Sequence, residues 1–372
     1  MNISTINKVI KYRTVKYINE RRGWTTKRKI VVIESDDWGS VRMPNREVYE
    51  KMLQSGIRVD LSVINKYDTL ASINDFEHLY SILSKYKDKN GNHPIITVNT
   101  IVANPDFDRI KASSFEEYYY EPFTKTLERY KNRSISSWIE GIDKKLIYPQ
   151  LHGREHLNVE RWMRFLRNGS KEVRFAFDNG LYGIGPDISL EKNPSFVPAF
   201  DSDVYLRKHE PENIIDDAYR LFADVFGFSS KSFIAPNYIW DERIEKALFG
   251  NNVKYLQGSF INKTATKENR YSYIGKTNKY GQIYTARNVH FEPSSSQRTN
   301  YVSNVIKQIN NAFQLNKPAI ISSHRYNFVG GVFEENRVRS LRLLDELLMN
   351  ITKRWSNIEF IHSAQLGDLI IE

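Results

Sequence analysis

Val31-Val32-Ile33-Glu34-Ser35-Asp36-Asp37-Trp38-Gly39-Ser40 is an apolar run that ends in two adjacent carboxylates and a glycine, and the fold prediction starts from it. The apolar run lacks polar alternation, which is typical of a strand covered on both faces of a parallel sheet, and Gly39 allows a turn directly after it. Two like charges in a half-buried place are costly unless a cation or a proton neutralises one of them. The stretch therefore indicates either a strand that delivers acid to an active-site mouth or an Asp pair that caps the next helix.

A second strand-like run, Leu146-Ile147-Tyr148-Pro149-Gln150-Leu151, is followed by His152 and His156. If His152 leaves the strand and His156 lies in the first turn of a helix, their spacing places both rings on one side. A lone histidine is more often a satisfied core or surface residue, but a pair at ligand spacing in a chain with eight histidines favours a metal site. One carboxylate of the first stretch and these two imidazoles would leave open positions for water and substrate, as in a catalytic divalent site.

The composition is that of an ordinary globular protein of 372 residues, 40% of them apolar and 13% aromatic. This length permits one large α/β barrel or two smaller domains. Because the chain has no cysteine, disulfides and thiolate ligands are excluded, and Asp, Glu and His remain as the strong metal ligands. No apolar stretch approaches the length of a membrane span, and the N-terminus lacks the apolar core of a signal peptide, so we expect a cytoplasmic protein.

The net charge of +10 is concentrated near the N-terminus. Residues 1–30 hold nine lysines or arginines against a single acid, Glu20, and the rest of the chain carries only +2. We interpret residues 1–28 as a basic N-terminal arm, whose apolar residues recur near helical spacing. Such an arm permits peripheral contact with an anionic membrane or a polyanion, or is a solvated face packed on the barrel floor. The interpretation as a solvated face packed on the barrel floor is favoured, and no specific nucleic-acid partner is expected.

Apolar runs and amphipathic segments alternate along the rest of the chain. Apolar runs predict strands at residues 29–36, 95–99, 146–151, 196–201, 232–236, 253–256, 283–291, 318–324 and 358–362. Helical spacing predicts helices at residues 46–55, 74–87, 114–129, 159–167, 211–226, 241–249, 302–313 and 337–348. Residues 168–195 are interpreted as an inserted loop and residues 261–290 as a hairpin excursion. Seven or eight strand and helix alternations without a break in composition predict a single domain, a parallel α/β barrel over residues 29–372.

Polar residues or prolines follow directly after many of these strands. They are Asp36, Asp37, Asn99, His152, Asp201, Pro236 and His324. In a parallel barrel the carboxyl ends of the strands share one face, which is where catalytic groups gather. We therefore expect these residues to line one site.

Four features of the chain occur in a definite order. They are the pair Asp36-Asp37 after a strand, His152-x-x-x-His156, Phe233-x-x-Pro236 with Tyr238, and a late strand ending in His324. In this order they resemble the motifs of the polysaccharide deacetylase family, the NodB-like carbohydrate esterases of type 4. The resemblance covers residues 29–362 and implies a deformed, TIM-like (β/α) barrel of NodB type with about seven or eight strands.

The resemblance also implies a role for each site residue. Asp36 would be the general base, and His324 the general acid that protonates the leaving amine. Asp37, His152 and His156 would hold a divalent metal. The residues by themselves leave open which of the two Asp side chains takes which role. Zinc suits one Asp and two His best, although cobalt, iron and manganese are compatible with these ligand types.

The chain departs from the family pattern at three of the motifs. The third motif usually carries an arginine that pairs with the catalytic Asp, and Ile234 stands there. Nothing matches the late Asp and Trp of the fourth motif, and Ser322 replaces the usual leucine of the fifth. Arg154, Arg287 and Arg325 are the candidates to replace the missing cation. Predicted substrate contacts are Trp38, Asn99, Pro236, Asn237, Tyr238 and Arg325, with Trp38, Tyr238 and Trp240 as an aromatic rim, although packing in the core explains each aromatic equally well.

Three functions are compatible with these residues. The leading hypothesis is a metal-dependent hydrolase that removes an N- or O-acetyl group from a carbohydrate, and a cytoplasmic location favours a precursor or glycoconjugate over a finished wall polymer. The lost motifs permit a catalytically inert barrel that binds a glycan or a partner. A metal-independent glycosidase would instead use two carboxylates, Asp36 with Asp178 or with Asp201.

Overall fold

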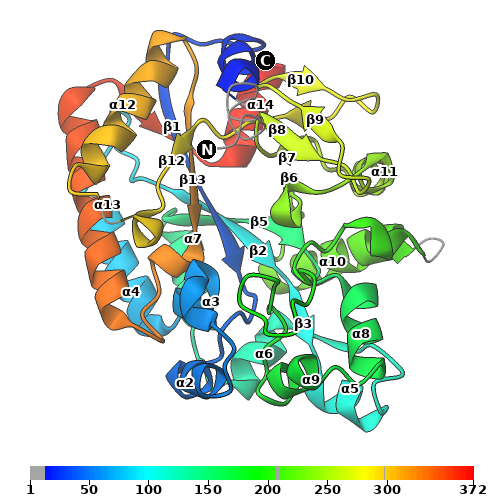
Figure 1. Cartoon of the computed structure of the whole chain (residues 1–372). Helices are drawn as coiled ribbons and strands as arrows, with labels where there is room; N and C mark the ends of the chain where they lie inside the picture. Colours follow the sequence, from blue (N-terminus) through cyan, green and yellow to red (C-terminus); the bar gives the residue numbers. More distant parts are fainter. Residues whose placement is uncertain (1–12, 207–209, 297) are drawn as a thin grey trace.

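The computed structural model describes residues 13–206, 210–296 and 298–372 and is built around a ten-stranded, mostly parallel sheet (Figure 1). The strand order is β10-β11-β7-β6-β5-β2-β1-β13-β12, with β14 also paired to β1. The strands of this sheet are β1 Lys29–Trp38, β2 Ile96–Ile101, β5 Ile147–Gly153, β6 Ser232–Ile234, β7 Tyr255–Gln257, β10 Lys276–Thr277, β11 Ile283–Tyr284, β12 Val289–His290, β13 Ala319–His324 and β14 Ile358–Phe360. Within the described ranges no ladder joins β12 to β11, so the barrel is not closed by hydrogen bonds. The predicted α/β class with a parallel sheet is confirmed.

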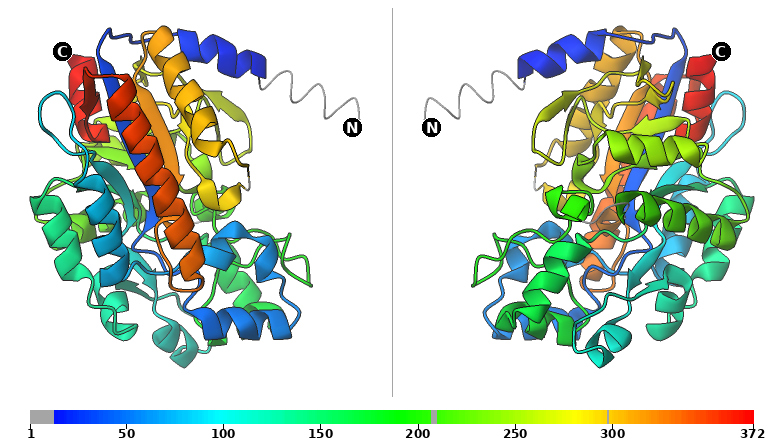
Figure 2. Two further views of the ribbon diagram at one scale, coloured as in Figure 1. Left: turned by 90° about the vertical axis from the view of Figure 1, so that its left-hand side faces the viewer. Right: turned by 90° about the vertical axis from the view of Figure 1, so that its right-hand side faces the viewer.

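Helices cover the outside of this sheet (Figures 1 and 2). They are α2 Arg46–Gln54, α3 Val63–Tyr67, α4 Ile73–Leu83, α5 Phe107–Ala112, α6 Phe123–Arg129, α7 Ile135–Asp143, α8 Val159–Arg167, α9 Lys171–Asp178, α10 Glu210–Phe226, α11 Glu242–Gly250, α12 Tyr301–Gln314, α13 Glu334–Arg354 and α14 Ser363–Ile371. Short 3₁₀ turns are η1 Val59–Leu61, η2 Ser202–Leu206, η3 Pro236–Tyr238, η4 Pro293–Ser295 and η5 Arg325–Asn327. The apolar faces of α4, α12 and α13 share one core cluster with β1, β2 and β13.

Strand β1 is buried from Ile30 to Trp38, as expected for a strand covered on both faces. It pairs with β13 so that Asp36 lies opposite His324. Its register with β2 shifts between Ser35 and Trp38, and Asp37 takes a left-handed conformation with φ of 72°. Bulges of this kind change the direction of a side chain. This irregularity is how two adjacent carboxylates come to serve different neighbours.

Several sequence predictions of secondary structure are wrong. Residues 196–201 form no strand, because Pro198 cannot donate to a ladder, and Phe196 and Phe200 pack into the core instead. The helix predicted at 114–129 is interrupted by the short strand β4, Tyr120–Pro122, which pairs with β3, Ala103–Pro105. The interval 168–195 contains the helix α9 and is not wholly a loop. Helices α7 and α14 were not predicted.

Two further segments flank the sheet. Residues 261–290 contain the antiparallel hairpin of β8, Ile261–Lys263, and β9, Asn269–Tyr271. Of the basic arm, residues 13–21 are helical and lie at the end of the molecule away from the carboxyl end of β1 (Figure 2), and residues 1–12 lie outside the described ranges. Lys317 Nζ donates to the carbonyl oxygens of residues 22–24 and ties the arm to the barrel. Among the described residues, none of the helices combines the length and apolar character needed to cross a bilayer.

Candidate metal centre and acid–base pair

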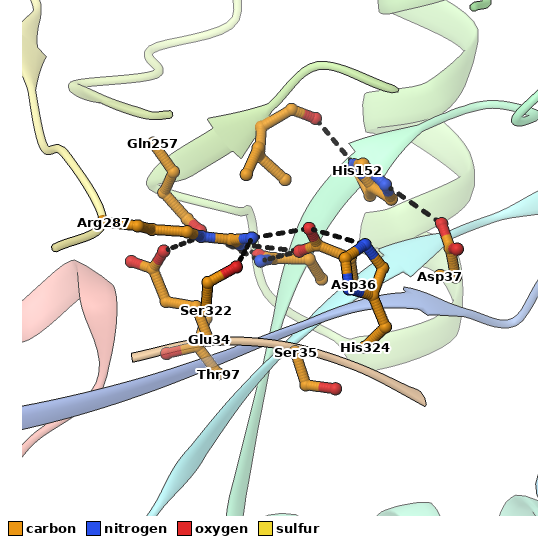
Figure 3. A network of polar contacts seen from close by, with 12 residues as sticks. Glu34, Ser35, Asp36, Asp37, Thr97, His152, Gln257, Arg287, Ser322 and His324 are labelled. Atoms are coloured by element: carbon orange, nitrogen blue, oxygen red, sulfur yellow. Dashed lines mark hydrogen bonds and ion pairs between the residues drawn. The ribbon is translucent and has the colours of Figure 1, made fainter. Parts of the chain in front are cut away.

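Asp37, His152 and His156 converge at the carboxyl ends of β1 and β5. The Oδ1 atom of Asp37 lies 3.4 Å from Nε2 of His152 and 3.3 Å from Nε2 of His156. The three candidate ligand atoms lie within 4.8 Å of one another, and all three residues are buried. Figure 3 shows Asp37 and His152 pointing toward one another. The predicted one-carboxylate, two-imidazole group is therefore assembled from segments more than a hundred residues apart.

The surroundings of His152 leave its Nε2 atom available. His152 Nδ1 lies 2.9 Å from the carbonyl oxygen of Ile234. A carbonyl only accepts, so Nδ1 carries the hydrogen and the neutral ring keeps its lone pair on Nε2. His156 precedes α8, whose N-cap Asn158 accepts a hydrogen bond from Arg161 N. Burial lowers the pKa of His156 to about 3 against the opposing charge of Asp37, so its ring is neutral at physiological pH, as a ligand requires.

The Asp37 carboxylate is ionised and one of its oxygens is unused. Burial alone would raise the pKa of this carboxyl, but His156 and the Arg42 guanidinium hold it well below its usual range. Its Oδ1 atom is buried and accepts no hydrogen bond from any residue of the described ranges. A buried anionic oxygen without a donor is costly unless a cation contacts it. One unused carboxylate oxygen facing two imidazole nitrogens fits a divalent metal with borderline preference, such as zinc.

Asp36 faces a different partner, the buried guanidinium of Arg287 (Figure 3). Arg287 Nη1 lies 2.6 Å from Asp36 Oδ2, and Nη2 lies 2.6 Å from Oδ1, a bidentate pair. Its Nε atom donates to Glu34 Oε2 at 2.6 Å. Burial opposes ionisation of Asp36, but Arg287 holds its pKa well below its usual range, whereas burial raises the pKa of Glu34. Of the three candidates for the missing cation, Arg287 is the one that pairs with Asp36.

The other two candidate arginines pair elsewhere. Arg154 binds Glu155 and Asp217, with Nε 2.6 Å from Glu155 Oε2. Arg325 donates from Nε to Asp68 Oδ1 at 2.8 Å and is fully buried. Neither of these guanidinium groups supports Asp36. None of the Arg325 side chain reaches the surface in this conformation, and its predicted contact with substrate stays a prediction.

Asn99 also orients Asp36. Its Nδ2 donates to Asp36 Oδ1 at 2.8 Å, and its amide exchanges hydrogen bonds with Gln257. Gln257 in turn donates to Ser232 Oγ at 2.8 Å. Asn99 is wholly buried and fixes the carboxylate of Asp36, and its predicted role in substrate binding stays a prediction. Polar groups in such a connected interior network hold one geometry because every member is satisfied.

His324 is held by a carboxylate that the sequence interpretation missed. Its Nδ1 lies 2.6 Å from Glu292 Oε1, and Asn327 donates to the other oxygen, Oε2, at 2.7 Å. Its Nε2 lies 3.9 Å from Asp36 Oδ2. Burial would lower the pKa of His324, but the charge and hydrogen bond of Glu292 outweigh it and raise the pKa to about 10. Glu292 follows directly after the predicted strand 283–291, the same signal that identified the other site residues.

The predicted aromatic rim is largely core. Trp38 is 1% exposed and packs against Phe76 and Trp138, and its Nε1 donates to Ser35 Oγ. Trp240 is 2% exposed and donates to Glu245. Both indole rings pack in hydrophobic clusters, and their predicted contact with a sugar stays a prediction that this packing does not support.

The motif around Tyr238 has a mixed outcome. Pro236 is buried, whereas Asn237 is exposed and Tyr238 is half-buried. Asn237 and Tyr238 both have positive φ, of 58° and 55°. A left-handed tyrosine is uncommon, and such strain concentrates at functional sites.

The two carboxylates considered for a glycosidase are engaged by cations elsewhere. Asp178 pairs with Lys111 at 2.7 Å on the surface. Asp201 Oδ2 pairs with Arg161 Nη2 at 2.7 Å and is buried. Within the described ranges, the cluster of acidic and imidazole side chains at ligand distance is the one formed by Asp37, His152 and His156. The structure does not bring either carboxylate into contact with Asp36.

The fold and the site define an α/β protein with a buried Asp-His-His group, a paired Asp and a paired His at the carboxyl ends of parallel strands. No family model matches the sequence, and a search of curated proteins finds no match. Among solved structures, a protein described as a polysaccharide deacetylase from Mycobacterium smegmatis matches at 10% identity, covering 94% of this chain and 93% of that one, with a TM-score of 0.45.

Two other solved structures show how wide the similarity is. A 4-alpha-glucanotransferase from Thermococcus litoralis matches at 11% identity over 92% of this chain and 40% of its own, with a TM-score of 0.45. A CE4 family pseudoenzyme from Bacillus anthracis matches at 8% identity over 92% of this chain and 66% of its own, with a TM-score of 0.39. Polysaccharide deacetylases are thus among the proteins that this chain resembles. At these identities and TM-scores, function is inferred from the site residues alone.

Proposed function

We propose that this protein is a metal-dependent hydrolase that removes an N- or O-acetyl group from a carbohydrate. The observation that carries the proposal is the convergence of Asp37, His152 and His156, with an unused carboxylate oxygen 3.3 and 3.4 Å from two imidazole Nε2 atoms. These three residues would hold the metal, with zinc the ion that the donor set suits best. When bound, a divalent metal supplies Lewis acidity towards the acetyl carbonyl and lowers the pKa of water.

The surroundings of the proposed acid and of the proposed base shift their pKa values in opposite directions. Asp36 is ionised because Arg287 lowers its pKa, and His324 is protonated at neutral pH because Glu292 raises its pKa to about 10. In the proposed reaction Asp36 accepts a proton from the attacking water. His324, held at Nδ1 by Glu292, donates the proton on Nε2 to the leaving nitrogen or oxygen. Two titratable groups with pKa values pushed apart are typical of acid–base catalysis.

The substitute partners favour catalysis over an inert barrel. The family motifs lack their arginine and their late Asp here, yet Arg287 and Glu292 occupy those roles from other positions. The bidentate cation on Asp36 and the 2.6 Å carboxylate contact on His324 hold both groups in the charge states that acid–base catalysis needs. We therefore propose Asp36 and His324 as the catalytic residues.

The proposed substrate is an acetylated carbohydrate in a precursor or glycoconjugate, which suits the expected cytoplasmic location. The motif resemblance supports the carbohydrate class. Asn237 and Tyr238 are proposed as substrate contacts because they are the accessible members of that motif and have positive φ. A Tyr ring at the edge of a site offers a flat apolar surface for a sugar.

The test measures bound metal and acetate release in the same preparations. The purified protein is assayed for metal content, and acetate release from acetylated sugars is followed with and without a chelator. His152→Ala is expected to lose both metal and activity, and Asp36→Asn to keep metal and lose activity. His78→Ala is the matched control, because His78 is exposed and its Nδ1 lies 2.7 Å from the carbonyl oxygen of Asn74, in its own helix α4.

Each outcome decides between the candidate functions. A metal-free protein whose acetate release is unaffected by chelator and by His152→Ala would overturn the proposal. Release of free sugar without acetate would indicate a glycosidase. Saccharide binding without turnover under any of zinc, cobalt, iron or manganese would indicate an inert barrel.

A further inference from the structure

Two buried arginines lie beside the candidate metal centre without a full set of partners. Arg42 is 4% exposed and Arg325 is wholly buried. Arg42 Nη1 lies 3.4 Å from Nδ1 of His156, a long contact, and Arg325 donates from Nε to Asp68. The Nη1 and Nη2 atoms of Arg325 have no hydrogen-bond partner in the described part of the chain. Buried guanidinium nitrogens are almost always satisfied, so these nitrogens retain the capacity to donate to an acceptor.

The contact between Arg42 and His156 cannot satisfy Arg42 in the metal-binding form. A neutral imidazole carries one hydrogen, and a free lone pair on Nε2 places that hydrogen on Nδ1. The guanidinium only donates, so it then faces another donor. Arg42 has no carboxylate at ion-pair distance among the described residues, although the charges of Asp37 and Asp68 and the hydroxyl of Tyr182 act on it. Arg42 therefore lacks an anionic acceptor when His156 is a ligand.

The charge around these two arginines is also unbalanced. They face one paired carboxylate, Asp68, which is wholly buried and whose Oδ2 accepts no hydrogen bond from the described residues. Asp37 is the other nearby carboxylate, and it is the proposed metal ligand. A bound divalent ion would add two positive charges to this region. Buried cations in excess of anions are costly, and an anion from outside the chain would remove that cost.

An open pocket of about 240 Å³ reaches Arg42 from the surface. Its walls come from α3 and from the segments 183–188 and 195–197. The hydrogen-bonding side chains in its lining include Ser62, Asn65 and Ser195. Asp187 is the acidic residue of the lining and is exposed to solvent. The pocket is smaller than the roughly 300–1,000 Å³ that take whole drug-sized ligands, so it fits a substituent better than a whole sugar chain.

The position of Gly183, in the lining of the pocket, shows that the pocket and Arg42 are adjacent. A Cβ atom placed on Gly183 would lie 4.0 Å from Arg42 Nη1 and 4.0 Å from Asn65 Nδ2. The same Nη1 atom lies 3.4 Å from Nδ1 of His156. Arg42 Nη1 is therefore close both to the lining of the pocket and to a candidate metal ligand. A group held in the pocket would sit next to the reacting centre.

We propose that this pocket, with Arg42 in its lining and Arg325 beside the same carboxylate, Asp68, is a subsite for an anionic substituent of the acetylated substrate, a carboxylate or a phosphate. The inference rests on the proposed function and names the class of carbohydrate that the site takes. Arg42 would contact the anion directly, because guanidinium pairs with carboxylate and phosphate through two parallel hydrogen bonds. Arg325 would act through the positive charge it adds. The enzyme would therefore select acidic over neutral acetylated sugars.

The test compares three probes that share an N-acetyl group and differ in charge. They are N-acetylglucosamine, which is neutral, N-acetylmuramic acid, which carries a carboxylate, and N-acetylglucosamine 1-phosphate. The metal-loaded wild-type protein is expected to bind at least one anionic probe about tenfold more tightly than the neutral one in calorimetry, and inorganic phosphate is expected to compete. The two anionic probes separate a carboxylate from a phosphate ligand. Equal affinity for all three probes would overturn the inference.

Variants assign the preference to Arg42. Arg42→Gln is expected to abolish the difference in affinity between the anionic and the neutral probe, and Arg42→Lys to restore part of it. Arg58→Gln is the matched control, because Arg58 is exposed and pairs with Asp60. A preference that survives in Arg42→Gln overturns the inference. Thermal unfolding of each variant identifies a misfolded protein, and in that case the wild-type comparison decides.

Binding and acetate release separate this inference from the proposed function. Preferential binding of an anionic probe with no acetate released from any probe would keep the subsite and remove the deacetylase. Acetate release at equal efficiency from all three probes would keep the deacetylase and remove the subsite.

Discussion

Two buried arginine clusters at the carboxyl end of the sheet differ in how fully they are bonded. Arg287 donates to Glu34, to both oxygens of Asp36, to Tyr238 and to Ser322. Arg325, equally buried, donates from Nε to Asp68 and leaves Nη1 and Nη2 without partners among the described residues. We call the cluster around Arg287 closed, because each nitrogen of its guanidinium donates a hydrogen bond. We call the cluster of Arg42 and Arg325 open, because it contains guanidinium nitrogens without partners among the described residues.

The difference indicates two roles: the guanidinium of Arg287 orients a neighbouring carboxylate, and the guanidinium groups of the open cluster retain donors for an anionic ligand. A saturated guanidinium fixes Asp36 before any substrate arrives, and pre-organised charge is what an acid–base site needs. An unsaturated one retains its capacity to bind an anion. The candidate metal ligands lie between the clusters, since Asp37 adjoins Asp36 in sequence and His156 contacts Arg42.

The largest expected effect tests whether Asp37 is a metal ligand or only a structural carboxylate of one of the two clusters. Asp37→Asn keeps the shape of the side chain and removes the anionic ligand. We expect loss of stoichiometric metal and a fall in kcat/KM of roughly ten-thousandfold, about 5 kcal/mol of transition-state stabilisation. Metal analysis measures the bound metal, and acetate release measures kcat/KM. The matched control is Asp36→Asn, one residue away, which should retain the metal. Metal retention by Asp37→Asn would show that Asp37 is a structural carboxylate only.

The second prediction sets the stability of the closed cluster against that of the open one. Arg287→Met leaves two buried carboxylates, Glu34 and Asp36, without their cation and should lower the free energy of unfolding by about 3–5 kcal/mol. Arg42→Met removes a cation that has no ion-pair partner in the described ranges and should lower it by about 1 kcal/mol or less. Urea denaturation of both variants gives the comparison. Similar losses would mean that the two clusters are equally bonded in solution.

The third prediction concerns the pair His324 and Glu292, which lies at the edge of the closed cluster. The pKa of His324 is raised to about 10, and Glu292 is the main favourable cause. A general acid must be protonated, so activity falls as pH rises through that pKa. Glu292→Gln removes the charge and should move the basic limb of the kcat/KM profile to lower pH, with a loss of about tenfold to a hundredfold at the optimum. Asn327→Asp is the complementary test, because added negative charge should not lower the limb.

The raised pKa of His324 also makes the free energy of unfolding depend on pH. The pKa of His324 in the folded state, about 10, lies above its ordinary value of 6.5. Its charged form is therefore favoured by folding, so this stabilisation is fully present below pH about 6.5 and is lost as pH rises towards 10. Glu292→Gln should flatten the pH dependence of the free energy of unfolding in that window. An unchanged slope would show that Glu292 does not raise the pKa.

The candidate metal centre could be predicted from the sequence because it depends on local patterns. An apolar run that ends in Asp36-Asp37 and a His pair four residues apart can be recognised in the chain, and strand ends meet at one face of a parallel sheet. The bulge that separates the roles of the two Asp residues could not be recognised, because it depends on the register with β2. The order of roles came from the resemblance alone.

The supporting residues were harder to predict for the same reason. Arg287 reaches Asp36 across 251 positions, and nothing near Arg287 in sequence marks it. Glu292 had a signal, its place after a strand, but a single Glu is a weak one. The environment of Trp38 could not be predicted, because an aromatic residue beside Asp36 and Asp37 fits a rim and a core equally well, and only packing against Phe76 and Trp138 decides.

The smallest expected effect measures how redundant the closed cluster is. Tyr238 Oη accepts from Arg287 Nη1 at 3.0 Å, and the same nitrogen also donates to Asp36 at 2.6 Å. Tyr238→Phe therefore leaves that nitrogen partnered and should change the free energy of unfolding by less than about 1 kcal/mol. Because the ring is retained, KM for an acetylated sugar should rise by no more than about threefold. A larger loss in kcat with KM unchanged would show that the Tyr238 hydroxyl takes part in the reaction. The cluster around Arg287 would then have a donor or acceptor available to substrate, as the cluster around Arg42 does.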